Sequence, residues 1–312
     1  MPRATPATPA SSPGIRTATR PGALPEGDAW FQPLEEQENF IRVLYYGKEG
    51  SGKTTHACRA ANMNQGRVLV IRAEAGLKTM ALRTQGVAVE NLVAYPAKSG
   101  ERITRAGLDA VYRRVASDLE KDPNSWYAVI WDSVTEIVTS VVDEVQASRV
   151  KKLIEKGREP DPFFTDREDY GTMTKMVRDL LRKYHALDCH LIVTALERRD
   201  VDEDTKKPMY GPAVTPALMT DLLGYVDMVL ACKAPDEIGP ARAYTRKVAK
   251  FRAKDRYGVL PPRMAEPTFD RIYAYLDDEL HEDTDPVQKT LSAKAATADD
   301  VKADLDDTQE KE

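Results

Sequence analysis

The residues with the clearest chemistry form a glycine-rich stretch at positions 47–54. They are Gly47, Lys48, Glu49, Gly50, Ser51, Gly52, Lys53 and Thr54, which match the pattern G-x-x-x-x-G-K-[ST]. In such a loop the backbone N–H groups surround phosphates, the lysine reaches the β- and γ-phosphates, and the hydroxyl of the last residue binds Mg²⁺. The pattern predicts a nucleotide site formed by these residues and Thr55, with ATP and Mg²⁺ as cofactors.

The segments on either side of this loop favour the same interpretation. Residues 40–46 are rich in β-branched and aromatic side chains and have the length of a strand. Residues 55–63 predict a helix, whose N-terminus would face the phosphates and add its dipole. The order strand, loop, helix is the one that phosphate binding requires.

A buried strand that ends in a carboxylate supplies the second expected element. Residues 126–131 are mostly apolar and are followed by Asp132. At the carboxyl edge of a parallel sheet this side chain would hold Mg²⁺ beside the phosphate loop. The alternative is a carboxylate that only caps the strand.

Two further strands deliver polar residues to the same edge. Residues 68–72 lead to Glu74, which could orient the attacking water or simply begin a helix. Residues 190–193 lead to Thr194, which could sense the γ-phosphate or simply end a strand.

The alternation of strand-like and helical segments predicts an α/β fold. We expect a mostly parallel twisted sheet with helices on both faces and an antiparallel extension from the last two strands. The expected strands are residues 41–46, 68–72, 91–94, 128–131, 190–194, 228–232 and 243–251.

Composition divides the chain of 312 residues into three parts. Residues 1–28, rich in Pro, Ala, Thr and Ser, predict a disordered arm, and residues 29–276 predict the folded domain. Residues 277–312 carry 13 acidic and four basic side chains, which predicts a disordered tail. That tail could serve solubility or mimic nucleic acid. The sequence contains no run of eighteen apolar residues, so no membrane span is expected. Its three cysteines are dispersed along the chain, which argues against a zinc site.

Several short stretches together resemble the RecA recombinase family. Ala73-Glu74-Ala75 resembles its A-E-H segment, and residues 130–134 resemble its V-V-D-S-V segment. Residues 91–96 and 99–101 resemble its N-L-L…P…T-G-E stretch. The similarity spans residues 41–251 and looks closest to compact phage-encoded RecA-like proteins that promote single-strand annealing.

The resemblance implies an ATPase in which Glu74 orients the hydrolytic water and two loops contact DNA. The first loop would contain Arg149, Lys151, Lys152, Lys156, Arg158, Phe163, Phe164 and Arg167. Its alternative is a solvated helix end with phenylalanines packed inward. The second loop would follow Thr194 and contain Arg198, Arg199, Lys206, Lys207, Tyr210 and Gly211, although Asp200, Asp202, Glu203 and Asp204 make it a poorer phosphate groove.

The family also implies a basic pair on a late strand that reaches a neighbouring subunit's γ-phosphate. Lys250 and Arg252 have the matching spacing, and strand alternation would place both on one face. The alternative is an edge strand protected by charge. The chain departs from the family at two places. Residues 78–81 contain no aromatic side chain to stack on adenine, which affects base selectivity. Thr194 stands where RecA has a glutamine, which affects the coupling between ATP and DNA.

We therefore expect a DNA-stimulated ATPase that assembles on single-stranded DNA, as a filament or ring, and anneals or pairs strands. Its partners would be single-stranded DNA, further copies of the chain and a single-stranded DNA-binding protein, with no membrane, in the cytoplasm of a bacterial host if phage-encoded. The rival hypothesis is a nucleotide-switched oligomeric scaffold without direct DNA contact. A hexameric helicase has no support, because no second motor or loading domain is visible.

Overall fold

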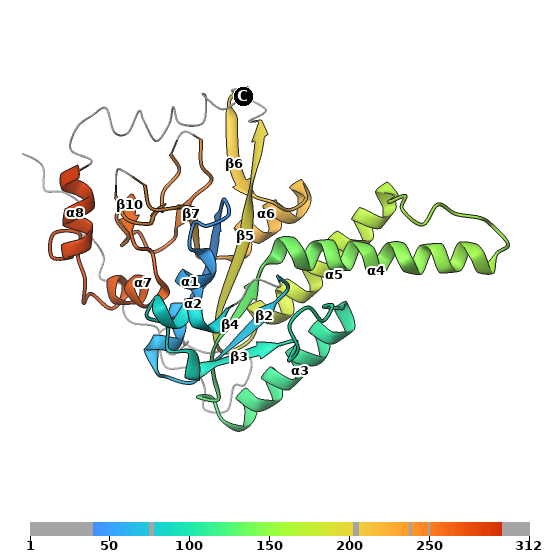
Figure 1. The fold of residues 1–312 in the computed structure, drawn as a ribbon, viewed down its shortest axis with the longest axis horizontal. Helices are drawn as coiled ribbons and strands as arrows, with labels where there is room; N and C mark the ends of the chain where they lie inside the picture. Colours follow the sequence, from blue (N-terminus) through green and yellow to red (C-terminus); the bar gives the residue numbers. More distant parts are fainter. Residues whose placement is uncertain (1–39, 75–77, 202–205, 237–238, 249, 295–312) are drawn as a thin grey trace, which may run out of the picture. The chain divides into compact units, whose positions relative to one another are not determined.

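The computed structural model describes residues 40–74, 78–201, 206–236, 239–248 and 250–294. Eight strands follow one another across the sheet in the order β10-β8-β7-β1-β5-β4-β2-β3, and β6 and β9 pair with β5 and β7 (Figure 1). The strands are β1 (Arg42–Gly47), β2 (Arg67–Arg72), β3 (Leu92–Tyr95), β4 (Trp126–Asp132), β5 (His190–Val201), β6 (Pro208–Pro212), β7 (Met228–Lys233), β8 (Arg242–Tyr244), β9 (Lys254–Asp255) and β10 (Arg263–Ala265).

The central strands run parallel, as the sequence predicts. β1 pairs in parallel with both β5 and β7, and β4 pairs in parallel with β5 and β2. Every residue of β1 and β4 is buried. Helices cover both faces of these strands, so side chains on either face are buried and the strand sequences are almost continuously apolar. The antiparallel extension is also confirmed: β8 pairs antiparallel with β7 and β10.

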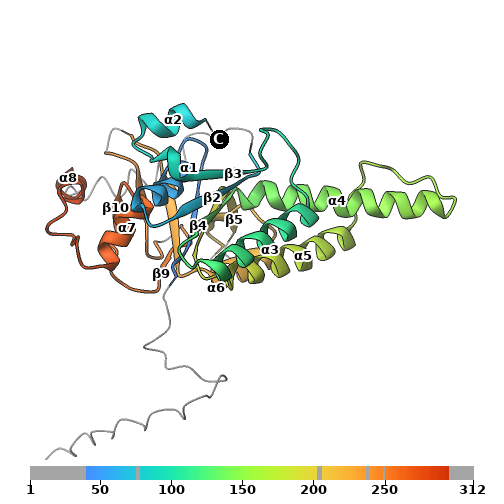
Figure 2. The same ribbon diagram turned by 90° about the horizontal axis from the view of Figure 1, so that it is seen from below.

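The helices are α1 (Lys53–Cys58), α2 (Thr79–Thr84), α3 (Arg105–Lys121), α4 (Val134–Glu155), α5 (Arg167–His185), α6 (Pro216–Tyr225), α7 (Phe269–Leu276) and α8 (Pro286–Lys294). Short 3₁₀ turns η2 (Arg59–Met63) and η3 (Val89–Asn91) complete them. One apolar core joins the sheet to α3, α4, α5 and α6, and a second joins its other face to α1, η2 and α7 (Figure 2). Within the described segments, no helix is long and apolar enough to cross a membrane.

The α4 and α5 helices form an arm that extends from the sheet (Figure 1). Their bases pack on the core through residues such as Ile137 and Val177, which are fully buried. The α5 helix begins with a capping box, in which the Asp166 side chain accepts from the backbone N–H of Glu168 and the Asp169 side chain accepts from that of Asp166. This cap fixes the direction in which the chain returns from the tip of the arm.

Three expectations about elements are wrong in part. The predicted strand 243–251 is found only as β8, because the described residues after Tyr244 belong to no strand until β9, although Phe251 forms isolated bridges with Tyr210 and Val248. The predicted strand 190–194 continues as β5 to Val201, since residues 197–201 pair with β6. The predicted disordered tail includes residues 277–294, which fold: Asp285 and Leu291 are buried and α8 contains nine residues. The predicted disordered segments 1–28 and 295–312 lie outside the described residues.

Candidate nucleotide site

The phosphate loop connects the end of β1 to the start of α1. Gly50 and Gly52 have φ values of 72° and 82°, a region that favours glycine. A Cβ atom on Gly47 would lie 2.5 Å from the Cys232 carbonyl oxygen of the neighbouring β7. The glycines of the motif are therefore required by the local backbone as well as by space for phosphates.

Lys53 is buried within this loop. Its Nζ donates to the carbonyl oxygens of Gly47 at 3.0 Å and Lys48 at 2.8 Å. The Ser51 hydroxyl also donates to the Lys48 carbonyl, at 2.8 Å. These bonds hold the ammonium group inside the curve of the loop, where a phosphate would be bound.

Asp132, the last residue of β4, lies beside the loop although 78 positions separate it from Thr54. The Thr54 hydroxyl is 2.9 Å and 3.1 Å from the two carboxylate oxygens, and the Thr194 hydroxyl donates to Oδ1 at 2.6 Å. Burial raises the pKa of Asp132, and the hydrogen bonds from Thr194 and Thr54 oppose that rise. Carboxylate and hydroxyl oxygens are hard ligands, so this pair fits Mg²⁺.

Glu74 follows β2 and is positioned by the chain around Asp132. The backbone N–H groups of Ala73 and Glu74 donate to the Asp132 carbonyl at 2.7 Å and 3.3 Å. The Ser133 hydroxyl donates to Glu74 Oε1 at 2.7 Å. Two carboxylates thus come together at one edge of the sheet, as the sequence predicts. The residues after Glu74, 75–77, lie outside the described part of the chain.

These residues face a common cavity of about 840 Å³. The residues of the phosphate loop and α1 that line it with the two carboxylates include Glu49, Gly50, Gly52, Lys53, Thr54, Thr55, Glu74 and Asp132. A smaller cavity of about 210 Å³ adjoins Thr54, Glu74 and Asp132. The larger volume falls in the range of small-molecule sites and has room for a nucleoside triphosphate.

Thr194 and the basic pair are placed differently from the expectation. Thr194 lies inside β5 rather than at its end, is fully buried, and lines neither of these two cavities. Lys250 and Arg252 belong to none of the ten strands and lie on either side of Phe251, which forms bridges with Tyr210 and Val248. The Tyr210 N–H donates to the Lys250 carbonyl at 2.6 Å, and the Arg252 N–H donates to the Tyr210 carbonyl at 3.0 Å. They too are absent from the walls of these cavities.

The first expected DNA loop forms the tip of the α4–α5 arm. Phe163 is 91% exposed and Phe164 is 57% exposed, so the alternative of inward-packed phenylalanines is wrong. Arg149 differs from its neighbours, because its guanidinium pairs with Asp169 and donates to the Phe164 carbonyl. Residues 149–168 contain six basic and five acidic side chains.

The second expected DNA loop is a hairpin of β5 and β6, and part of it belongs to the core. Tyr210 is buried and stacks on Phe251 with ring centroids 5.3 Å apart. Arg198 donates to the Val214 carbonyl at 3.3 Å. Residues 202–205 lie outside the described part of the chain.

Sequence reasoning missed further residues that line the large cavity. They are His56, Arg59, Gln85, Pro235, Pro240, Ala241, Glu266, Thr268 and Arg271. His56 and Arg59 are three positions apart after the phosphate loop, which helical periodicity could have placed on one face. Nothing in the local sequence relates Thr268 or Arg271 to a loop more than 200 residues earlier.

The parallel sheet, the glycine-rich loop between β1 and α1, and the Asp at the end of β4 are the arrangement of a P-loop nucleotide site. Residues 39–257 match the model of the AAA domain family, so the chain belongs to that family. Among solved structures, the crystal structure of the RadB recombinase is similar, with 15% identity, a TM-score of 0.42, and coverage of 67% of this chain and 82% of that one. None of the curated proteins shows a match.

Proposed function

We propose that the protein hydrolyses ATP at the cavity between the phosphate loop and the two carboxylates. The observation that carries this proposal is the convergence of Glu74 and Asp132 on Thr54 and Lys53. The N–H groups of residues 47–55 and Lys53 would bind the phosphates, and Thr54 with Asp132 would hold Mg²⁺. When bound, Mg²⁺ would neutralise charge on the phosphate oxygens.

Glu74 is the proposed group that orients the attacking water. It lines both cavities together with Thr54 and Asp132, so a water beside the terminal phosphate would be within its reach. The bond from Ser133 occupies only one carboxylate oxygen, Oε1. Glu74 Oε2 is the candidate acceptor for a water proton.

Thr194 is a proposed positioning residue. Its hydroxyl donates to Asp132 Oδ1, while the hydroxyl of Thr54 contacts both oxygens of the same carboxylate. This arrangement fixes the rotation of the carboxylate about its own axis. Thr194 would then influence the γ-phosphate through Asp132 rather than by direct contact.

We extend the proposal to a DNA-stimulated ATPase that assembles on single-stranded DNA and anneals or pairs strands. The exposed Phe163 and Phe164 at the tip of the arm offer faces on which nucleobases could stack. Nearly balanced charge on this segment makes stacking, more than phosphate attraction, the expected source of affinity. The resemblance to compact phage-encoded annealing proteins supports this extension. By the same resemblance, the proposed location is the bacterial cytoplasm, and a proposed partner is a single-stranded DNA-binding protein.

Lys250 and Arg252 are proposed to complete the site of a neighbouring subunit. Phe251 stacks between Tyr210 and Tyr244, with centroid distances of 5.3 Å and 5.2 Å, and so anchors the segment that carries both bases. An anchored pair outside its own cavity would deliver positive charge to another copy's γ-phosphate. Hydrolysis would then depend on assembly into a filament or ring.

The substitution Glu74→Gln tests the proposed ATPase most selectively. Turnover should fall by about 10²-fold or more, because the amide cannot take up a proton, while ATP affinity stays nearly unchanged. The exposed Glu90 supplies the control, and Glu90→Gln should leave both quantities as they are. Unchanged turnover in E74Q would contradict the proposal and favour a nucleotide-switched scaffold.

A further inference from the structure

The connection at the far end of the α4–α5 arm combines exposed aromatic rings with a backbone that is held in place by hydrogen bonds (Figure 1). Residues 156–166 link the two helices and belong to no helix or strand. The rings of Phe163 and Phe164 project from this connection into solvent. Large apolar side chains grouped on a surface mark interaction sites, so the order of the backbone needs a reason other than burial of the rings.

Both ends of the connection are fixed where the helices end. At the end of α4, the Arg158 N–H donates to the Leu153 carbonyl at 3.0 Å. Gly157 has a φ of 71°, a left-handed conformation that commonly terminates a helix. At the start of α5 lies the capping box described above, which sets the direction in which the chain enters that helix.

Gln146, a residue of α4, holds the middle of the connection. Its Nε2 donates to the carbonyl oxygens of Pro162 at 2.7 Å and Phe164 at 3.3 Å. Its Oε1 accepts from the Thr165 hydroxyl at 3.3 Å. These bonds reach the residues on both sides of Phe163, and so they fix the backbone from which the most exposed ring projects.

Arg149, also on α4, joins the same connection to the start of α5. Its Nε donates to the two carboxylate oxygens of Asp169 at 3.2 Å and 2.9 Å, and its Nη2 donates to the Phe164 carbonyl. Its central carbon lies 5.8 Å from the centre of the Phe164 ring. Asp169 is only 3% exposed, so loss of its partner would leave a buried charge unpaired. The positive charge of Arg149 is therefore used within the protein.

A fixed backbone favours stacking on the two rings. A nucleic acid that binds a mobile loop must also order that loop, and the lost entropy weakens the affinity. When the connection is already ordered, this cost falls on folding instead of on binding. A guanidinium suits the purpose, because its donors form a rigid fork that meets a carboxylate and a carbonyl at the same time.

We propose that Arg149 and Gln146 are positioning residues, which hold residues 161–165 so that Phe163 and Phe164 present their faces to unpaired nucleobases. This inference rests on the proposed function, since it takes single-stranded DNA as the partner of the arm. Arg149 then acts on DNA through the two rings rather than by contact with a phosphate.

The test measures the affinity of the full chain for a labelled single-stranded oligonucleotide by fluorescence anisotropy over a range of salt concentrations. Arg149→Gln should weaken binding about three- to tenfold and leave the slope of log affinity against log salt unchanged. Loss of a phosphate contact would instead reduce the magnitude of that slope by about 0.7. Gln146→Ala changes no charge and should weaken binding in the same direction.

Two further variants separate positioning from direct contact. Arg149→Lys keeps the charge but lacks the fork, so it should bind as weakly as R149Q, whereas a phosphate contact would be retained. In a chain that already carries Phe163→Ala and Phe164→Ala, Arg149→Gln should cause no further loss, because the effects of residues that act through one another are not additive.

Arg114→Gln is the matched control, because Arg114 pairs with Asp118 at 3.0 Å within α3, outside the arm. It should leave affinity and slope unchanged, and thermal unfolding with DNA-independent ATP hydrolysis should confirm that every variant folds. Full affinity in both R149Q and Q146A, or an equal loss from R149Q with and without the rings, would overturn the positioning role. Failure of wild type to bind the oligonucleotide would instead overturn the proposed contact with DNA.

Discussion

The proposed function depends on two groups of side chains, one at the carboxyl edge of the sheet and one at the tip of the α4–α5 arm. The two groups differ in burial and in bonding. At the sheet edge, Lys53, Asp132 and Thr194 are buried and bonded to one another or to the loop. At the tip of the arm, Phe163 projects into solvent. Phosphate chemistry needs preorganised groups, whereas a flexible strand of varied sequence is better served by an open stacking surface.

The largest effect should come from breaking the sheet-edge site. Lys53→Ala removes the buried cation of the phosphate loop, and ATP hydrolysis should fall by about 10²-fold or more, since charge stabilisation near a transferring phosphate is worth several kcal/mol. Phosphate release is the measurement. Lys121→Ala, at an exposed position in α3, should retain wild-type activity. Substantial hydrolysis by K53A would place the chemistry elsewhere.

Breaking the arm should have a smaller effect and leave the cavity intact. Phe163→Ala should reduce affinity for single-stranded DNA about tenfold, because stacking contributes about 1–3 kcal/mol per base, while DNA-independent ATP hydrolysis is unchanged. Fluorescence anisotropy with a labelled oligonucleotide measures the affinity. Tyr257→Ala, at an exposed aromatic remote in sequence from the arm, is the control. Equal losses in both variants would remove the special role of the tip.

The smallest effect concerns the scaffold that separates these regions. His190, at the start of β5, is buried among aromatic rings, and its Nδ1 accepts from the Ile41 N–H at 2.9 Å. Burial lowers its pKa to about 4. The unfolded chain therefore takes up a proton as pH falls below about 6.5, and the folded chain does not until about pH 4, so stability is lost across that interval.

A histidine substitution can isolate this contribution. Between pH 7.5 and 5.5 wild type should lose about 1 kcal/mol of unfolding free energy through His190 alone, with a similar loss through His56. His190→Gln should remove its own part of this dependence in urea denaturation. His281→Gln, at an exposed position, should leave the dependence unchanged. An identical pH dependence in H190Q and wild type would contradict a dry, neutral His190.

Local pattern was enough to predict the parallel core and the phosphate end of the cavity. The apolar runs before Gly47 and Asp132 identify buried strands, and the carboxyl ends of parallel strands meet at one edge, which brings Asp132 to Thr54. The same rule misplaced Thr194, because the hairpin with β6 continues the strand beyond it. Strand pairing of this kind depends on residues far along the chain.

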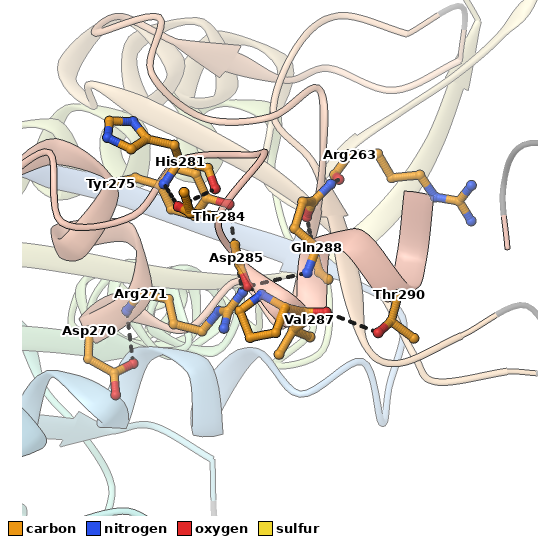
Figure 3. A network of polar contacts seen from close by, with 12 residues as sticks. Arg263, Asp270, Arg271, Tyr275, His281, Thr284, Asp285, Val287, Gln288 and Thr290 are labelled. Atoms are coloured by element: carbon orange, nitrogen blue, oxygen red, sulfur yellow. Dashed lines mark hydrogen bonds and ion pairs between the residues drawn. The ribbon is translucent and has the colours of Figure 1, made fainter. Parts of the chain in front are cut away.

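The contacts of Arg271, which also lines the cavity, could not be predicted because they join distant segments. Asp285 falls within a stretch whose charge predicts disorder, yet Arg271 and Tyr275 neutralise and bury it. A prediction from composition treats this carboxylate as solvated, whereas in the folded protein it is paired with Arg271 (Figure 3). Likewise, the sequence pattern predicts that the strand containing β8 continues through residues 245–251. In the structure Phe251 instead packs between Tyr210 and Tyr244.

The most direct test of the account is ATP hydrolysis by the full chain as single-stranded DNA is added, at low and at high salt, with electron microscopy of the same samples. The account predicts that DNA accelerates phosphate release, that assemblies form on the DNA, and that rising salt weakens the acceleration only in part, because base stacking persists at high salt. Hydrolysis that proceeds at one rate with and without DNA, at every salt concentration, would contradict it.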